Sequence, residues 1–385
     1  MSEARINRIS NEKGDGGPSL SGITTFSGLN YFVPPKGTTA ERPSDCPPGS
    51  IRFNTDSAHL EYWDGLQWLE FEASSVELGI QNNAAGTSGG LGTRALAGGL
   101  NNSGYVDTIE YYTISTLGNS IDFGNLTGNR GNGVGACASS TRGIFASGYP
   151  NTTQGNIIDY VTFSSTGDAI DFGDTINKSE GRRALSNQTR GVTFGGSDRA
   201  NSFAYYNLMD YITIASTGDA QDFGDLSADI DAFGYNGAFS SSTRGVLGGG
   251  GNSPTATNVI NYFTISSQGN TQDFGDLTYT ANQGVAGMSN PTRGIFASGG
   301  SPTNVDIVFV TISTTGNAQD FGDMVTGNSY STGGASSTRG LLAAGGGGNA
   351  VQYINIPTTG NAAVFGDLWS SASDAQMPTN GHGGL

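Results

Sequence analysis

A Thr-Arg dipeptide recurs six times after residue 92, and this repeat constrains the fold more than any other feature of the chain. Consecutive copies are 48, 48, 54, 49 and 46 residues apart. A period of this size is typical of an architecture that stacks one supersecondary unit many times. Because one such unit cannot bury a core alone, the copies must pack against one another. The arginine column comprises Arg94, Arg142, Arg190, Arg244, Arg293 and Arg339.

Aromatic and glycine columns mark a hairpin inside each unit. Seven residues after each aromatic residue comes a glycine followed by Asn or Asp, which favours a tight turn because glycine tolerates a positive φ. A phenylalanine followed by glycine lies 12 residues after the aromatic residue in all six copies. This invariant spacing predicts two antiparallel strands. The aromatic column comprises Tyr111, Tyr160, Tyr211, Tyr262, Phe309 and Tyr353, and the phenylalanine column comprises Phe123, Phe172, Phe223, Phe274, Phe321 and Phe365.

Two further strands are predicted in each unit. One is the apolar run after each arginine, as at 143–148, and the other is a weaker segment that leads to the next Thr-Arg. Four strands at a period near 48 match a propeller blade. The predicted fold class is therefore all-β, with a six-bladed β-propeller over residues 76–385. Residues 79–92 resemble one more strand, which leaves a seven-bladed ring open as an alternative, and an open β-solenoid is the rival architecture.

The composition excludes several kinds of partner and cofactor. The chain has 62 glycines, only 13% charged residues and a formal net charge of −16. This charge argues against nucleic acid and against an anionic membrane surface. No apolar run approaches 18 residues, so we expect no membrane insertion. The two cysteines and two histidines have no metal-ligand spacing, and we expect neither a metal nor a cofactor.

An acidic column accompanies the arginine column. One interpretation is a set of carboxylates that binds Ca²⁺. The other is one arginine–aspartate pair per unit that clamps neighbouring elements, and the shared period favours this clamp. Copied charges also argue against an enzyme, because catalysis needs a constellation that occurs once, so we predict no catalytic residue. The column consists of Asp122, Asp171, Asp222, Asp273 and Asp320.

Recognition is expected where the repeats differ. The segment from arginine to aromatic residue varies in length and is longest in the third unit, at 197–207. Variable loops on a rigid scaffold usually carry binding residues. Basic side chains nearby, at Lys178, Arg182 and Arg183, suit an acidic glycan. The alternative is that the aromatic residues cap a neighbouring unit. The candidate ligand-binding residues are Arg199, Phe203, Tyr205 and Tyr206.

The region before the repeats has a different character. Residues 1–45 are predicted to form an extended anchoring segment, and residues 46–75 a small β-hairpin module turning at Asp64-Gly65. A segment this short cannot build a core of its own, so its apolar residues need another protein surface. The candidate anchor residues are Phe26, Tyr31, Phe32, Trp63 and Trp68.

Three stretches resemble known proteins. Gly49-Ser-Ile-Arg-Phe-Asn-Thr55 followed by Tyr62-Trp-Asp-Gly-Leu-Gln-Trp68 is similar to a small β-module of tailed-bacteriophage fibre proteins. Residues 21–43 look like virion structural proteins of marine cyanophages. The Thr-Arg-Gly and Asp-Phe-Gly-Asp repeats resemble tail or fibre proteins of the same phages, and their glycines and period loosely resemble kelch repeats.

The resemblance implies a non-enzymatic structural protein of the virion. It implies a tail fibre or receptor-binding component that docks to other virion proteins through its N-terminal segment and meets a host surface glycan or protein. A capsid or neck decoration protein, a propeller glycan hydrolase and a cellular kelch-like interaction module are the alternatives. Fibre modules of this kind imply a homo-oligomer, with a trimer as one form.

Overall fold

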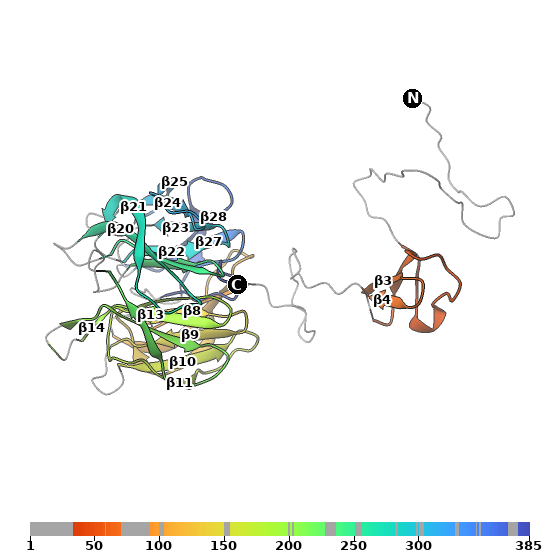
Figure 1. Ribbon diagram of the computed structural model, residues 1–385, viewed down its shortest axis with the longest axis horizontal. Helices are drawn as coiled ribbons and strands as arrows, with labels where there is room; N and C mark the ends of the chain where they lie inside the picture. Colours follow the sequence, from red (N-terminus) through yellow and green to blue (C-terminus); the bar gives the residue numbers. More distant parts are fainter. Residues whose placement is uncertain are drawn as a thin grey trace, which may run out of the picture. The chain divides into compact units, whose positions relative to one another are not determined.

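The computed structural model describes residues 34–57, 59–70, 93–99, 104–149, 155–198, 201, 204–227, 236–250, 256–281, 284–297, 299, 304–327, 331–343, 345, 348–368 and 376–385. The chain divides into two compact units, Met1–Val76 and Glu77–Leu385. Figure 1 colours the first unit red to orange and the second orange to blue. Each unit is described below by itself.

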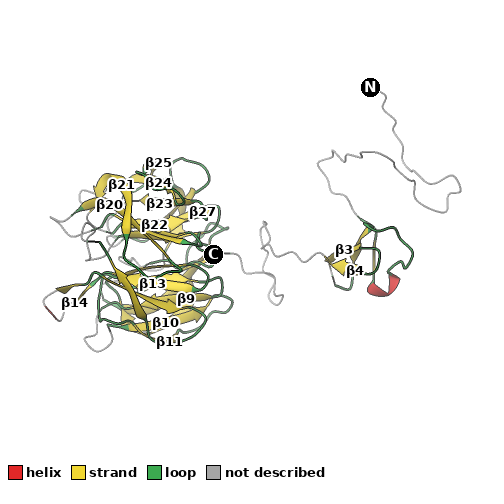
Figure 2. Ribbon diagram, in the orientation of Figure 1, coloured by secondary structure: helices red, strands yellow, loops and turns green. Residues whose placement is uncertain are grey.

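The first unit contains a small sheet in the order β1-β2-β3-β4 (Figure 2). Strand β1 (Lys36–Gly37) pairs parallel with β2 (Ile51–Asn54), which pairs antiparallel with β3 (His59–Trp63), and β3 pairs antiparallel with β4 (Trp68–Glu70). A single 3₁₀ turn, η1 (Thr39–Glu41), follows β1. This sheet begins before residue 46, so part of the segment that we expected to be extended belongs to the module.

The predicted turn at Asp64-Gly65 joins β3 to β4. The Asp64 side chain accepts hydrogen bonds from the backbone N–H groups of Leu66 and Gln67, and Gly65 has a φ of 106°. An aspartate that bonds forward in this way, followed by a glycine with positive φ, is what closes a short hairpin loop.

The second unit is all-β and consists of repeated antiparallel sheets, in agreement with the predicted propeller-like class. Sheet 1 has three strands, and sheets 2 to 6 have four strands each. A two-stranded hairpin of β14 and β15 is inserted in sheet 3. The strands of sheets 1 to 3 are β5 (Arg94–Gly98), β6 (Val106–Thr113) and β7 (Ile121–Arg130); β8 (Gly135–Ala138), β9 (Arg142–Ala146), β10 (Ile157–Thr162) and β11 (Ile170–Asp174); and β12 (Arg183–Ser186), β13 (Arg190–Phe194), β16 (Leu208–Thr213) and β17 (Gln221–Asp225), with β14 (Ser197–Asp198) and β15 (Ala204–Tyr205). The strands of sheets 4 to 6 are β18 (Gly237–Ser240), β19 (Arg244–Gly248), β20 (Thr257–Thr264) and β21 (Gln272–Ala281); β22 (Ala286–Ser289), β23 (Arg293–Ala297), β24 (Asp306–Thr311) and β25 (Gln319–Asp323); and β26 (Thr332–Ala335), β27 (Arg339–Ala343), β28 (Ala350–Asn355) and β29 (Ala363–Asp367).

The sheets are offset from the sequence repeat. Each four-stranded sheet begins with the short strand that precedes a Thr-Arg, so the weak fourth strand of one sequence unit is the first strand of the next sheet. These first strands lie next to one another from sheet to sheet, β8 beside β12, β12 beside β18, β18 beside β22 and β22 beside β26. The strand that begins at each arginine comes next in the sheet, and the two strands of the 12-residue hairpin follow it, as predicted.

Residues 376–380 take the place of a first strand beside sheet 1. Ala95 and Gly98 of β5 form bridges with Thr379 and Gln376. The Leu96 N–H donates to the Pro378 carbonyl, and the Asn380 N–H donates to the Arg94 carbonyl. The alternative that residues 79–92 supply this strand concerns residues outside the described part of the chain.

Each junction between sheets brings two glycines together. A hairpin glycine donates its N–H to the carbonyl of the phenylalanine column in the preceding sheet, as Gly167 does to Phe123, and Gly118 of sheet 1 does the same to Phe365 of sheet 6. A Cβ on Gly124 would lie 2.3 Å from the Gly167 carbonyl oxygen. A side chain there would clash with backbone, so the Phe-Gly of every repeat follows from this close approach.

The core is divided among the junctions. Six clusters of buried apolar side chains are found among the described residues, and each joins two neighbouring sheets, sheets 6 and 1 included. Between sheets 1 and 2, for example, Leu96, Phe123 and Phe145 are almost completely buried. Full burial of side chains of this size stabilises by roughly 1.5–3 kcal/mol each.

Candidate functional site

The arginine column clamps neighbouring sheets, but its partner differs from the prediction. Each guanidinium lies over the aromatic ring of its own sheet, at 4.4–4.7 Å from the ring centroid. Each Nη1 also donates to a backbone carbonyl of the next sheet, as Arg244 does to Ile312 at 2.8 Å and Arg339 of sheet 6 does to Ile114 of sheet 1 at 2.8 Å. The contact combines a cation–π interaction with a charge-assisted hydrogen bond.

The predicted aspartate partner is wrong. Among the described residues no ion pair joins the arginine column to the aspartate column. Asp122, Asp171, Asp222, Asp273 and Asp320 lie exposed on the last strand of their sheets. The reason is geometric, because each arginine and each aspartate of one sheet lie on strands that are separated by a third strand. In the described part of the chain no three acidic, histidine or cysteine side chains gather as metal ligands.

Two buried ion pairs of the second unit were missed from the sequence. Arg130 Nη2 lies 2.5 Å from Asp159 Oδ2, and Arg182 Nη1 lies 3.0 Å from Asp210 Oδ2, with both members of the second pair fully buried. Asp159 also accepts from the Thr127 N–H of the preceding sheet. The available signal was a polar residue directly before the aromatic residue, in a strand that is otherwise apolar. Five of the six copies have it, and the remaining copy has Val308 there. The five polar residues are Glu110, Asp159, Asp210, Asn261 and Gln352.

This burial also corrects the predicted basic cluster. Arg182 and Arg183 are 0% and 2% exposed, so neither can meet a glycan at the surface. Lys178 forms electrostatic interactions within the unit.

The longest variable loop forms a small hairpin of β14 and β15. Ser197 pairs with Tyr205 and Asp198 with Ala204. The Tyr206 N–H donates to the Gly196 carbonyl, and the Tyr206 hydroxyl donates to Asp198 at 3.4 Å. Burial and the Asp198 carboxylate raise the pKa of Tyr206. Tyr205 is 55% exposed, while Arg199 and Phe203 lie outside the described residues. Figure 1 shows β14 on an arm that projects from the unit.

A cavity of about 60 Å³ lies between the first strands of the sheets and residues 376–382. A water molecule needs about 10–15 Å³ on this scale, so the cavity holds a few waters and is too small for a sugar ring. Ser186, Ser240 and Ser289 line it, each donating a hydrogen bond to a carbonyl of the preceding first strand. The cavity is therefore structural in character.

Residues 381–385 lie against the ends of the first strands, and His382 lines the cavity. His382 Nε2 lies 2.9 Å from the Ala138 carbonyl, the Gly384 N–H donates to His382 Nδ1, and the Gly383 N–H donates to the Ser289 carbonyl. Nε2 therefore carries the proton and Nδ1 accepts, which requires a neutral ring. Burial lowers the pKa of His382, and the bond to Ala138 offsets part of this effect.

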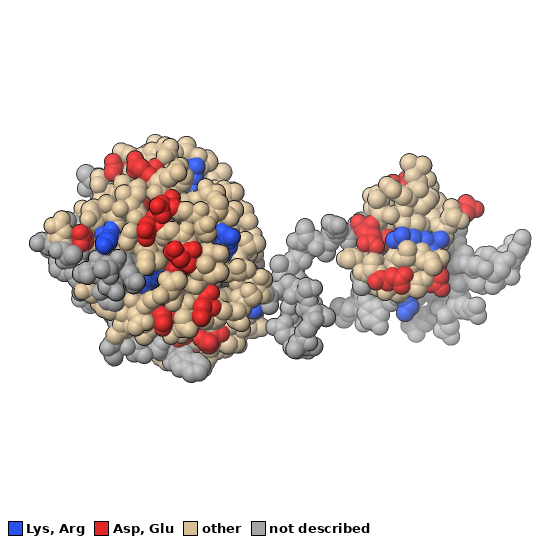
Figure 3. Space-filling model, turned by 90° about the horizontal axis from the view of Figure 1, so that it is seen from below, with Lys and Arg blue, Asp and Glu red and all other residues tan. Residues whose placement is uncertain are grey.

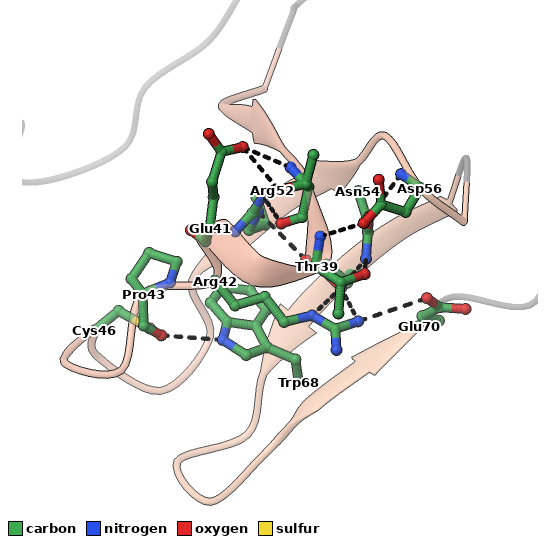
Figure 4. A network of polar contacts seen from close by, with 12 residues as sticks. Thr39, Glu41, Arg42, Pro43, Cys46, Arg52, Asn54, Asp56, Trp68 and Glu70 are labelled. Atoms are coloured by element: carbon green, nitrogen blue, oxygen red, sulfur yellow. Dashed lines mark hydrogen bonds and ion pairs between the residues drawn. The ribbon is translucent and has the colours of Figure 1, made fainter.

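The first unit is held by a polar network on one face of its sheet (Figure 4). The Glu61 carboxylate is fully buried and accepts from Arg42 Nη2 at 2.6 Å and from Asn54, with Arg52 at 3.3 Å. Burial alone would raise the pKa of Glu61, but the bonds from Arg42 and Asn54 outweigh it and lower this pKa. Trp68 Nε1 donates to the Pro43 carbonyl.

The opposite face of this sheet is apolar and open within the unit. Ile51 and Leu60 are 51% and 42% exposed. Phe53, Tyr62 and Leu69, which are half-buried, lie on the same face by strand register. Of the candidate anchor residues, Trp63 and Trp68 pack against each other with ring centroids 5.7 Å apart and ring planes tilted by 48°. Phe26, Tyr31 and Phe32 lie outside the described residues.

Comparison with known proteins adds no relative, because no family model and no curated protein matches the chain. Where the chain is described, no helix is long and apolar enough to cross a membrane.

Proposed function

We propose that the chain is a non-enzymatic structural protein of a phage virion, a tail-fibre or receptor-binding component. The first unit docks it to other virion proteins, and the second presents a recognition loop. The observation that carries this proposal is that the repeated charged residues make structural contacts between the sheets. The arginine column and the buried carboxylates hold sheets together, which leaves the chemistry of recognition to the loops, where Tyr205 is exposed.

The division into two units supports the same proposal. A small module with an open apolar face needs a protein surface to cover it. A larger unit with one core at every sheet junction is rigid enough to position a loop. The trimer implied by the resemblance stays a prediction.

The proposal includes a finer description of the fold, a closed six-bladed β-propeller. It rests on the contacts of sheet 6 with sheet 1 through Arg339 and Gly118, and on the pairing of residues 376–380 with β5. The variant Ala95→Cys/Thr379→Cys tests it, because opposite strand residues have the spacing that a disulfide needs. Oxidation should link the two cysteines within one chain. Failure to form this link in folded protein would contradict closure through residues 376–380.

Binding to host cells tests the function. Saturable binding of purified protein should fall at least about 10-fold for Tyr205→Ala, as for an aromatic hot spot, and remain unchanged for Ile170→Thr, an exposed residue on β11. Labelled antibody should locate the chain on intact particles. If the chain is absent from the virion, the proposal is contradicted. If it is present at the copy number of the capsid lattice and does not bind host cells, a decoration role replaces the proposal. New reducing ends released from host polysaccharide would make the protein a hydrolase.

A further inference from the structure

One face of the sheet in the first unit is apolar and lies open among the described residues. Ile51 and Leu60 are 51% and 42% exposed, and three further apolar side chains are half-buried. By strand register the five side chains form two rows, the first of which runs from β2 through β3 to β4. An open apolar group of this kind marks a contact surface. We call Ile51, Phe53, Leu60, Tyr62 and Leu69 the module face.

The charged side chains of the described strands flank the module face and do not lie across it. Glu61 and Glu70 are on the opposite face, where both contact Arg42. Lys36 of β1 lies beside Phe53 by register, at the edge of the module face. A long lysine stem packs along apolar surface while its ammonium group stays in water. A neutral apolar occupant would therefore bury no carboxylate here.

The chain enters the sheet beside this face. Strand β1 runs parallel to β2, and the Pro35 carbonyl accepts a hydrogen bond from the Phe53 N–H at 2.7 Å. Continued backwards by two residues from Lys36, this register places Pro34 level with Ile51 in the first row. The chain before Pro34 therefore begins at one edge of the module face.

The residues directly before this point are rich in apolar side chains and carry no charge. Residues 21–33 hold six apolar residues and no Asp, Glu, Lys or Arg. Residues 3–15 hold six charged residues, and residues 71–92, which follow β4, hold two glutamates. The module face is about 10 Å wide from β2 to β4, which about three extended residues span, so the segment is long enough to cross it. Its apolar residues are Ile23, Phe26, Leu29, Tyr31, Phe32 and Val33.

The part of the chain after β1 covers the other face of the same sheet. There Arg42 bonds to Glu61, and Trp68 Nε1 donates to the Pro43 carbonyl (Figure 4). Strand β1 is thus an edge from which the chain reaches one face with the residues that follow it. Among the described residues only the module face lacks such a covering segment.

We propose that residues 21–33 cover the module face of their own chain. The tether holds the segment at an effective concentration of about millimolar, which a separate partner must exceed. A second copy is a poorer occupant, because the chain carries a net charge of −16 and acidic side chains spread over the visible face of the second unit, with few basic ones between them (Figure 3). Phe26, Tyr31 and Phe32, the expected anchor residues, then have a binding site within the chain. The inference does not rest on the proposed function, although docking through this face would require displacement of the segment.

Maleimide labelling of the full chain tests the inference. The background is Cys46→Ser, in which the other cysteine, Cys137, is buried. Leu60→Cys places a thiol on the module face, and Leu66→Cys places one in the β3–β4 turn, where Leu66 is 89% exposed. A covered thiol reacts only when the segment opens, so Leu60→Cys should react about 10-fold more slowly than Leu66→Cys. Its rate should stay constant from about 1 to 100 μM protein, because the contact lies within one chain.

A polar segment should uncover the face. The polar variant is Phe26→Ser/Leu29→Ser/Phe32→Ser, which removes three of the apolar side chains. It should raise the labelling rate of Leu60→Cys about 10-fold and leave that of Leu66→Cys unchanged, because the segment loses the apolar area that holds it on the face.

The control is Thr24→Ser/Thr25→Ser, a conservative change in the same segment, which should leave the rate of Leu60→Cys unchanged. Ile51→Cys in the first row repeats the test if Leu60→Cys does not fold. Labelling of Leu60→Cys as fast as Leu66→Cys shows an open face, protection that grows with protein concentration shows a second copy, and protection that survives the polar variant shows another occupant. Each of these results overturns the inference, and an open face leaves the proposed docking to virion proteins unaffected.

Discussion

The two units are both β-structures and both bury ion pairs, yet they place their apolar side chains in opposite ways. The module of β1 to β4 buries charge, with Glu61 fully buried between Arg42 and Arg52, and leaves Ile51 and Leu60 exposed. The repeat unit buries apolar side chains at every sheet junction and exposes its aspartate column. The 14 strand residues of the module cannot enclose a hydrophobic core, so the module relies on directional bonds instead.

The two units therefore draw their stability from different kinds of contact. In the module one carboxylate holds two cations, so its stability is concentrated in few atoms. In the repeat unit the same contact is copied at six junctions, so each copy contributes a small share. The predictions below test how far this contrast holds.

The largest effect is expected from deletion of residues 376–385. The deletion removes buried Met377, the bonds of Leu96 and Asn380, and the hydroxyl bond of Thr379. Loss of a buried methionine costs about 2–5 kcal/mol and each hydrogen bond about 1 kcal/mol. We expect unfolding free energy to fall by more than about 5 kcal/mol in denaturant titrations. Deletion of residues 383–385 alone is the control and should cost much less, and equal losses would contradict a strand role for 376–380.

A smaller but more local loss is expected from Glu61→Leu. The change leaves Arg42 and the 7% exposed Arg52 side chain without their carboxylate. Breaking a buried ion pair costs about 3–5 kcal/mol. The fluorescence of Trp63 and Trp68 should report unfolding of the module at lower denaturant. Ile51→Thr on the open face should change stability by less than about 0.5 kcal/mol, and an equal effect of both variants would remove the contrast between the faces.

Arg244→Ala should have a moderate effect. The variant loses the stacking on Tyr262 at 4.4 Å and the bond to the Ile312 carbonyl. Together these contacts are worth about 2 kcal/mol. The melting temperature should fall without loss of host binding, and Arg244→Lys should restore only part of it, because lysine lacks the planar group. An unchanged melting temperature would show that single junctions are dispensable.

The smallest effect is expected from acid titration of His382. Because its folded pKa lies below the ordinary value near 6.5, its contribution is complete above that pH and is lost as the pH falls toward the folded pKa. Melting temperatures between about pH 7.5 and 5 should therefore decline less for His382→Gln than for wild type. His59→Gln, at a side chain that is 48% exposed, is the matched control.

The sequence predicted local backbone structure better than it predicted which groups the side chains contact. The 12-residue hairpin, the glycine turns and the turn at Asp64 follow from periodicity and backbone preference, and the structure has them. The partner of the arginine column did not follow, because a shared period does not distinguish a carboxylate from a carbonyl that every repeat also contains. The open apolar face of the module could not be predicted either. Alternating side chains define two faces of a sheet, but they do not show which of these faces η1 covers.

The offset between repeat and sheet has a mechanical consequence. The last strand of each sheet continues along the chain into the first strand of the next, so covalent bonds cross every junction that the arginines clamp. A sheet that detaches must pull its neighbour with it. Linear repeat arrays fray from their ends one unit at a time. A force applied to this unit should instead extend it little until one junction yields, and the remaining sheets should then follow in a single event.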